Sequence, residues 1–203
     1  MTRIIASLIG TSLIIATPLL HANEREMQSP DARTTIQSWP KEAKKAAEMM
    51  IQKYGQPDEV TAMRVVWHDN GPWKRTVVTK EETDHAFPMP HKDVLEQVID
   101  YRVATDKVDD LAKYDGSVIV ERTKGELSAR CDKEEANFLA LNLANDVATG
   151  KKSAEAAREQ YAQTIQALMA GKPDPYVQKL QFAAQQSAAD PDKPATMKHA
   201  QAD

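Results

Sequence analysis

The sequence predicts an α+β domain, in which an antiparallel sheet from two hairpins has helices packed on one face. Two observations lead to this prediction. Several segments repeat apolar residues at helical spacing, and two pairs of β-rich runs are each joined by a short turn. Because the two hairpins are separated by helical segments, one mixed domain accounts for the whole pattern.

The first predicted helix ends at Gly55, and Pro57 prevents its continuation. Ser38 is its expected cap, and Pro40 suits its first turn. The face expected to be buried follows the spacing of one helix side and consists of Ala43, Ala46, Ala47, Met50, Ile51 and Tyr54.

A hairpin follows this helix, with strands around 60–67 and 73–79. The pair Asn70-Gly71 lies between them and is typical of a tight hairpin turn. The segment 82–91, with its two prolines, is then expected to be a connecting loop.

Two helices are predicted after the loop. The first covers 93–103 and the second covers 106–114, ending at Gly116. The apolar face of the first helix consists of Val94, Leu95, Val98 and Ile99.

The second hairpin pairs 117–123 with 126–131 around a turn at Lys124-Gly125. Asp132 and Glu135 then form a predicted capping box for a helix over 133–149.

The helix over 133–149 carries apolar residues on both sides, so we expect it to be sandwiched between the sheet and the next helix. That next helix covers 153–170 and begins at Ser153, and a weaker helix is expected over 175–186. Three asparagines on the sandwiched helix must find partners or line a cleft, namely Asn137, Asn142 and Asn145.

The chain divides into four predicted parts. Residues 1–22 form a signal peptide, 23–37 a flexible linker, 38–186 a single α+β domain, and 187–203 a disordered tail.

The signal peptide is predicted from its three regions. Arg3 gives a positive start, residues 4–20 are apolar or small, and Ala22 suits the cleavage position. The apolar stretch is shorter than the roughly 20 residues that span a bilayer. We therefore expect a periplasmic or secreted protein with no membrane anchor after cleavage.

Charge and composition exclude several classes of function. The formal net charge is −4, so nothing favours binding to nucleic acid. The glycines lie far apart, and no dinucleotide fingerprint or phosphate loop is present. We expect no cofactor.

Much of the chain resembles a group of exported bacterial proteins of unknown function. The resemblance rests on KYGQPDEV (53–60), GPWKRTVV (71–78), FPMPHKDVLEQVIDYRV (87–103) and the long stretch 107–146. It implies bacterial export and a single domain, and it implies no activity.

Cys131 is the only cysteine, so no disulfide forms within the chain. Its place before a helix suits a nucleophile that is paired with a histidine. The same place also suits a small buried apolar residue packed against Ala136.

The predicted loop offers a possible copper site. His85, Met89 and His91 combine imidazole and thioether ligands, and Asp84 and His68 could join them. The alternative is an ordinary connecting loop.

A ligand site is also predicted around Arg102, which points into the apolar face of the helix over 93–103. A guanidinium there either extends to water or binds an anionic group in a cleft. Trp67, Trp73 and Arg75 on the first hairpin are the expected walls of that cleft.

These observations favour a non-enzymatic exported protein that binds an envelope protein or a small ligand. Two alternatives stay open. One is an envelope hydrolase that uses Cys131 with a histidine, and the other is a copper-handling protein that uses the loop His85–His91.

Overall fold

The computed structural model describes residues 31–172, 174–183 and 185–195. The predicted signal peptide and residues 23–30 of the predicted linker lie outside the described residues, as do residues 196–203 of the tail.

The described chain forms one open antiparallel sheet of six strands in the order β1-β2-β3-β4-β6-β5. The strands are β1 (Glu59–Val60), β2 (Arg64–Asn70), β3 (Trp73–His85), β4 (His91–Asp100), β5 (Val118–Glu121) and β6 (Glu126–Cys131).

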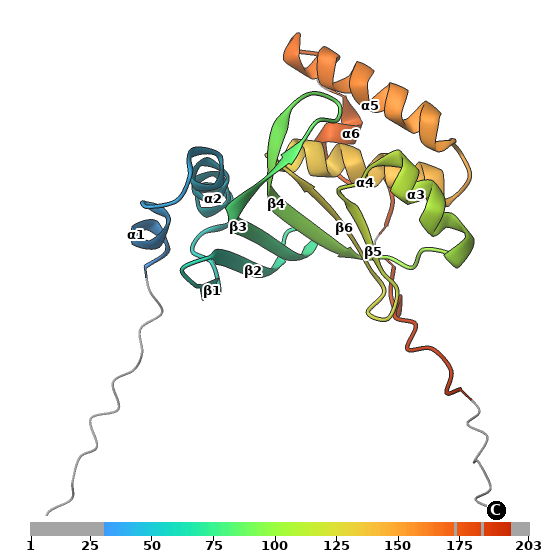
Figure 1. The fold of residues 1–203 in the computed structure, drawn as a ribbon, viewed down its shortest axis with the longest axis horizontal. Helices are drawn as coiled ribbons and strands as arrows, with labels where there is room; N and C mark the ends of the chain where they lie inside the picture. Colours follow the sequence, from blue (N-terminus) through green and yellow to red (C-terminus); the bar gives the residue numbers. More distant parts are fainter. Residues whose placement is uncertain (1–30, 173, 184, 196–203) are drawn as a thin grey trace, which may run out of the picture.

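Six α-helices accompany the sheet in the described residues: α1 (Ala32–Ile36), α2 (Lys41–Tyr54), α3 (Val108–Tyr114), α4 (Glu134–Ala148), α5 (Ala154–Met169) and α6 (Pro175–Gln178). A single 3₁₀ turn, Thr105–Lys107, leads into α3. The longer helices lie on one side of the sheet, with α5 outermost above α4 (Figure 1). The predicted α+β class is confirmed.

The helix predicted over 93–103 is wrong, because β4 occupies most of this segment and joins the two hairpins into one sheet. Residues four apart share one side of a helix, but they also share one face of a strand. Val94 and Val98 therefore lie on one face of β4, and Leu95 and Ile99 lie on the other. All four are buried, so both faces of β4 are covered.

The predicted loop over 82–91 is shorter than expected. β3 continues to His85 and pairs with His91 at the start of β4, so only residues 86–90 connect the two strands. This extension brings the two histidines together.

Helix α2 packs on the first half of the sheet over a buried cluster that includes Val65, Trp67, Val78 and Leu95. Ser38 does not cap this helix, because the N-cap position is Pro40. The Glu82 carboxylate takes that role instead, accepting the backbone N–H groups of Glu42 at 2.9 Å and Ala43 at 3.1 Å.

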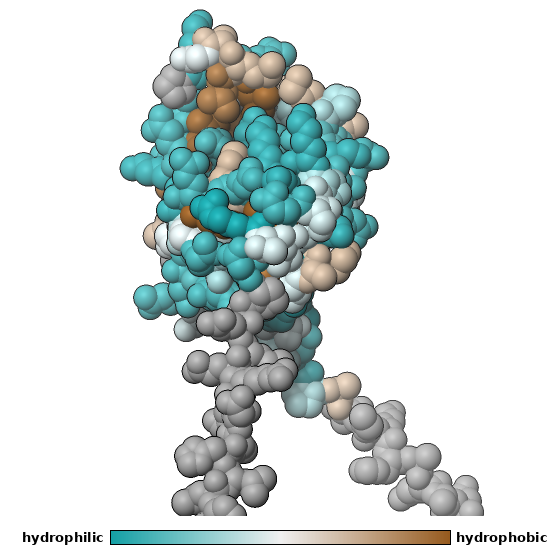
Figure 2. Space-filling model, turned by 90° about the vertical axis from the view of Figure 1, so that its left-hand side faces the viewer, coloured by the Kyte–Doolittle hydropathy of each residue, from teal (hydrophilic) through white to brown (hydrophobic). Residues whose placement is uncertain are grey.

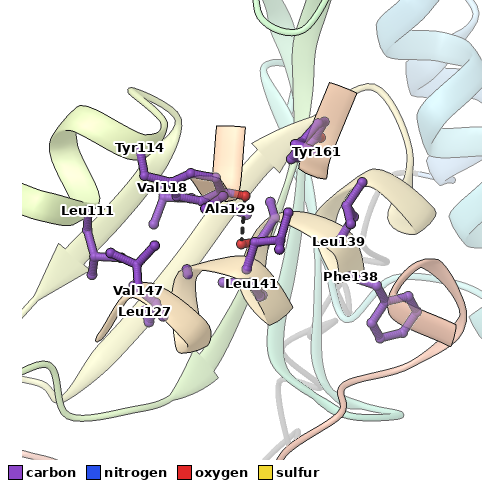
Figure 3. Close-up of a cluster of buried hydrophobic side chains, with 14 of the residues drawn as sticks. Leu111, Tyr114, Val118, Leu127, Ala129, Phe138, Leu139, Leu141, Val147 and Tyr161 are labelled. Atoms are coloured by element: carbon purple, nitrogen blue, oxygen red, sulfur yellow. Dashed lines mark hydrogen bonds between the residues drawn. The ribbon is translucent and has the colours of Figure 1, made fainter. Parts of the chain in front are cut away.

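Helix α4 is sandwiched as predicted, with α5 and α6 on its outer side and β4 and β6 beneath it. Figure 3 shows the core that it covers, where Val147 and Leu141 of α4 lie near Leu127 and Ala129 of the sheet. Tyr114 of α3 also lies in this core, and its hydroxyl donates a hydrogen bond to the Ala140 carbonyl of α4 at 3.3 Å.

The capping box predicted at Asp132 is wrong. Lys133 is the N-cap of α4, with extended backbone and no side-chain cap, so the helix starts one residue later than an Asp132 cap requires. Ser153 does cap α5, as its side chain accepts the Ala156 N–H at 3.2 Å.

The predicted linker and tail are partly ordered in the described residues. Helix α1 falls within 23–37 and buries Ala32 and Ile36. In the tail, Ala188 is buried and Asp190 pairs with Arg122. The helix predicted over 175–186 is only the single turn α6.

Within the described residues, no helix has the length and apolar character needed to cross a membrane.

Candidate metal centre

Polar side chains gather in a buried position where β3 ends and β4 begins. His85 and His91 are direct partners in the β3–β4 register, and their ring centroids lie 4.9 Å apart. Asp93 follows two residues after His91, so both side chains lie on the same face of β4. That face is the one covered by the helices, because Leu95 and Gln97 continue it into the core.

Three side chains of this cluster converge closely enough to hold one metal ion. One ligand atom from each of His85, His91 and Asp93 lies within 4.8 Å of the other two. The shortest approaches are 3.1 Å between His91 Nε2 and Asp93 Oδ1, and 3.4 Å between His85 Nδ1 and Asp93 Oδ2. We call these three residues the His–His–Asp cluster.

Neighbouring groups orient the cluster. The Met89 carbonyl lies 2.9 Å from His91 Nδ1, which places the donor N–H on that nitrogen and turns Nε2 toward Asp93. The Ser117 hydroxyl donates to Asp93 Oδ2. Asp115 lies 3.6 Å from His85 Nε2 and accepts the Ser117 backbone N–H at 2.8 Å.

The cluster is withdrawn from water. The side chain of Asp93 is 1% exposed, and those of His91 and His85 are 13% and 18% exposed. Buried charges of this kind are retained only when they are paired or bind a metal.

The charges of the cluster are strongly coupled. Interaction with the Asp93 carboxylate raises the pKa of His91 to about 11, and Cys131 makes the second-largest contribution in the same direction. Burial alone would raise the pKa of Asp93, but hydrogen bonds from His91 and Ser117 outweigh it and lower the pKa. Burial raises the pKa of Asp115.

Cys131 adjoins the cluster through His91, with 3.3 Å between Sγ and Nε2. The residue is 5% exposed, and burial raises the pKa of its thiol, although His91 opposes that effect. The thiol lies in the wall of a cavity of about 160 Å³ whose other lining residues include Pro88, Met89, Tyr161 and Ile165.

A second hollow of about 320 Å³ leads to the two histidines from outside, and it is lined by Asp84, His85, Ala86, Pro90, His91 and Lys92. His91 therefore lines both hollows. Figure 2 shows hydrophobic surface gathered near the top of the molecule, at the height of α5 and the β3–β4 connection in Figure 1.

The structure brings together two of the three predicted copper ligands. His85 and His91 face each other, whereas Met89 is 45% exposed and contacts His91 through its backbone carbonyl. The two further candidates lie elsewhere: Asp84 pairs with Lys92 at 2.6 Å, and His68 pairs with Glu59 at 2.7 Å.

The ligand site predicted around Arg102 is not formed. Arg102 follows β4, has a side chain 55% exposed, and pairs with Asp190 of the C-terminal segment. Trp67 and Trp73 are 2% and 1% exposed, so neither can be the wall of an open cleft. Arg75 pairs with Glu126 at 2.9 Å.

The two tryptophans and the asparagines of α4 have structural partners. The Trp67 indole donates to the Gly55 carbonyl at 3.0 Å, and the Trp73 indole donates to Glu134 at 2.7 Å. Each asparagine also bonds to protein groups: Asn137 to Leu95, Asn142 to Tyr176 and Lys179, and Asn145 to Tyr101.

Sequence reasoning missed Asp93, Asp115 and Ser117. Asp93 begins the helix predicted over 93–103, whereas His91 ends the predicted loop, so that prediction does not place the two side chains on one face. The signal was the alternation His91-x-Asp93 just after a turn, which in a strand puts both side chains on one face. No signal in the sequence connects Asp115 and Ser117 with β4.

The fold and the site define an α+β domain that carries a buried His–His–Asp cluster. Comparisons with protein family models, with curated proteins and with solved structures found no match. What this cluster can do chemically therefore follows from its own geometry: it can bind a metal ion, or it can pair a thiol with an imidazole.

Proposed function

We propose that this chain is a non-enzymatic exported protein whose small ligand is a transition-metal ion held by the His–His–Asp cluster. The observation that carries the proposal is the convergence of the three ligand atoms within 4.8 Å of one another. Export is supported by the signal pattern of residues 1–22.

The donor types support this class of ligand. Imidazole suits zinc, copper, iron and nickel, and two imidazoles with one carboxylate form a common transition-metal ligand set. The imidazoles and the carboxylate come from paired strands rather than from a loop, so the side chains are positioned before a metal arrives. Because the pKa of His91 is raised to about 11, the metal would replace the proton on His91 Nε2, and that proton would pass to solvent. A bound cation would also offset the nearby buried carboxylates of Asp93 and Asp115.

A hydrolase is the second candidate function. It is favoured by the 3.3 Å approach of Cys131 Sγ to His91 Nε2, with Met89 orienting the imidazole from its far side. It is less well supported, because His91 Nε2 is shared with Asp93 and the thiol is almost fully buried. Turnover of small ester and thioester substrates, lost in Cys131→Ala, would favour it.

The metal proposal is tested by calorimetric titration of purified, chelator-stripped protein with zinc. We expect one ion per chain in the wild-type protein and strong loss of affinity in His91→Gln and Asp93→Asn. His68→Gln is the matched control, because His68 pairs with Glu59 away from the cluster.

Folding of each variant is checked by thermal unfolding. In the wild-type protein, saturating zinc should raise the melting temperature, because the ion binds only the folded state. Absence of binding to the wild-type protein, or an equal loss in His68→Gln, would contradict the proposal.

A further inference from the structure

A polar hollow of about 200 Å³ lies on the face of the sheet opposite α2 and α4. Gln97 of β4 contacts side chains of both helices, so its neighbour Glu96 belongs to the other face. Arg130 is the β6 register partner of Glu96 and shares that face. The hollow is lined by Thr79, Glu81 and Thr83 of β3, by Val94 and Glu96 of β4, and by Arg130 of β6.

The hollow forms where the β3–β4 ladder is interrupted. Between the register pairs Val78–Leu95 and Thr83–Asp93, residues 79–82 of β3 bulge out of the ladder. Such bulges re-aim side chains and are frequent next to functional sites. Asp93 also lines the hollow, but its carboxylate belongs to the His–His–Asp cluster on the helix side of the sheet.

Arg130 brings an unpaired positive charge to this hollow. Its Nε is buried, and within the described residues the guanidinium has neither a hydrogen-bond acceptor nor a carboxylate at ion-pair distance. Other cations on the same face are paired: Arg75 lies 2.9 Å from Glu126, and Lys92 lies 2.6 Å from Asp84. A buried donor without an acceptor is costly, and a ligand carboxylate would satisfy the guanidinium with two parallel hydrogen bonds.

The hollow also contains negative charge without a counter-ion. Glu96 accepts the Ser128 hydroxyl at 2.6 Å, and in the part of the chain that the structure describes neither Glu96 nor Glu81 forms an ion pair. These two carboxylates would repel a simple anion, and Arg130 would repel a simple cation. A ligand that carries both a carboxylate and an ammonium group suits all three side chains.

The size of the hollow limits the ligand. A water molecule occupies about 30 Å³ in the liquid, so about 200 Å³ admits roughly six to eight non-hydrogen atoms. Alanine and serine are of this size. The buried Val94 side chain offers a small apolar surface to the ligand's own side chain.

We infer that this hollow binds a small zwitterionic amino acid, whose carboxylate pairs with Arg130 and whose ammonium group pairs with Glu96 and Glu81. The site is separate from the His–His–Asp cluster and does not depend on the proposed metal, because its charged side chains lie on the other face of the sheet.

Calorimetric titration of the purified protein with glycine, L-alanine and L-serine tests the inference, with EDTA present so that no metal takes part. We expect one molecule of amino acid per chain. Propionate lacks the ammonium group of alanine, and ethylamine lacks its carboxylate. Each should therefore bind at least about tenfold more weakly than alanine, because part of the charged site is left unpaired.

Two variants locate the binding. Arg130→Met keeps most of the side-chain stem without the guanidinium, and Glu96→Gln removes one negative charge, so both should weaken alanine binding at least about tenfold. Arg102→Met is the matched control and should bind as the wild type does, because Arg102 pairs with Asp190 away from the hollow. Alanine should raise the melting temperature of the wild type but not that of Arg130→Met.

Absence of binding of all three amino acids to the wild-type protein would overturn the inference. Equal affinity for alanine and propionate, or undiminished binding by Arg130→Met, would overturn it too. Thermal unfolding shows whether each variant is folded. If Arg130→Met does not fold, the comparison of alanine with propionate and ethylamine in the wild-type protein still decides.

Discussion

His85 and His91 form the last pair of the β3–β4 ladder, and they face each other across the two strands. Directly opposed side chains in an antiparallel pair start from Cβ atoms about 4.5–5.5 Å apart, so the register of the sheet sets the spacing of the two rings. The spacing of the two histidines therefore does not depend on the connecting residues 86–90.

This relationship predicts that the thioether of Met89 is dispensable. Met89→Leu should change zinc affinity by no more than about twofold, because the residue contacts His91 through a backbone carbonyl that leucine also provides. Calorimetric titration measures the affinity. A tenfold loss in this variant would restore the thioether to the ligand set.

A second prediction concerns Glu134, a buried carboxylate in the first turn of α4. It accepts the Tyr54 hydroxyl at 2.5 Å, the Trp73 indole at 2.7 Å and the Gln97 amide at 3.0 Å, and it also pairs with Lys53. Replacement by glutamine puts an amide donor among these donors, so Glu134→Gln should lower the free energy of unfolding by about 2–3 kcal/mol at pH 7.

The loss should depend on pH. Burial would raise the pKa of Glu134, but the ion pair with Lys53 and the hydrogen bonds outweigh it and lower the pKa below 4.5. The charge therefore stabilises the fold above pH 4.5, and this stabilisation is lost as pH falls through the lower folded-state value. Urea unfolding at pH 7 and about pH 3 should show the variant's deficit shrinking, while Glu135→Gln, at an exposed neighbour, shows little deficit at either pH.

The two candidate caps give a third, paired prediction. Ser153→Ala should cost about 1 kcal/mol, because the serine side chain accepts the Ala156 N–H at the start of α5. Asp132→Ala should change stability by less than about 0.5 kcal/mol, because Asp132 does not cap α4. Chemical denaturation of both variants tests this, and an equal cost at the two positions would mean that α4 begins at Asp132.

A fourth prediction concerns Gly125, in the β5–β6 turn. Its φ of +67° is unfavourable for other residues, and a methyl group there would overlap the backbone of Ala188 and Ala189 in the C-terminal segment. Gly125→Ala should cost roughly 3 kcal/mol. Gly150→Ala, with a φ of +74° and open space around it, should cost about 1–2 kcal/mol. Equal melting temperatures for the two variants would show that the C-terminal segment does not pack on the turn.

The sequence predicted the elements whose local signals agree with their tertiary setting. Helix α4 shows this best, because apolar residues on both of its sides indicated a sandwiched helix, and the structure places it between sheet and helices. The prediction from the sequence is wrong at β4. Pairs of apolar residues four positions apart are expected both on one side of a helix and on one face of a strand. Only pairing with β3 and β6 decides between them, and pairing is not a local property.

The incorrect prediction of a helix over 93–103 also accounts for the incorrect ligand site around Arg102 and for the omission of Asp93. If the segment 93–103 were a helix, Arg102 would point into its apolar face and Asp93 would lie apart from the histidines. With β4 as a strand, His91 and Asp93 share a face, and β6 delivers Cys131 to within 3.3 Å of His91. The residue types were visible in the sequence, but which of them meet is set by strand order.

The central claim is that the His–His–Asp cluster binds a transition-metal ion, and anomalous diffraction at the zinc absorption edge from crystals grown with zinc tests it most directly. We predict one strong peak about 2.0–2.2 Å from ligand atoms of His85, His91 and Asp93. A map without density among these residues, or with its main peak at an exposed pair such as His68 and Glu59, would contradict the claim.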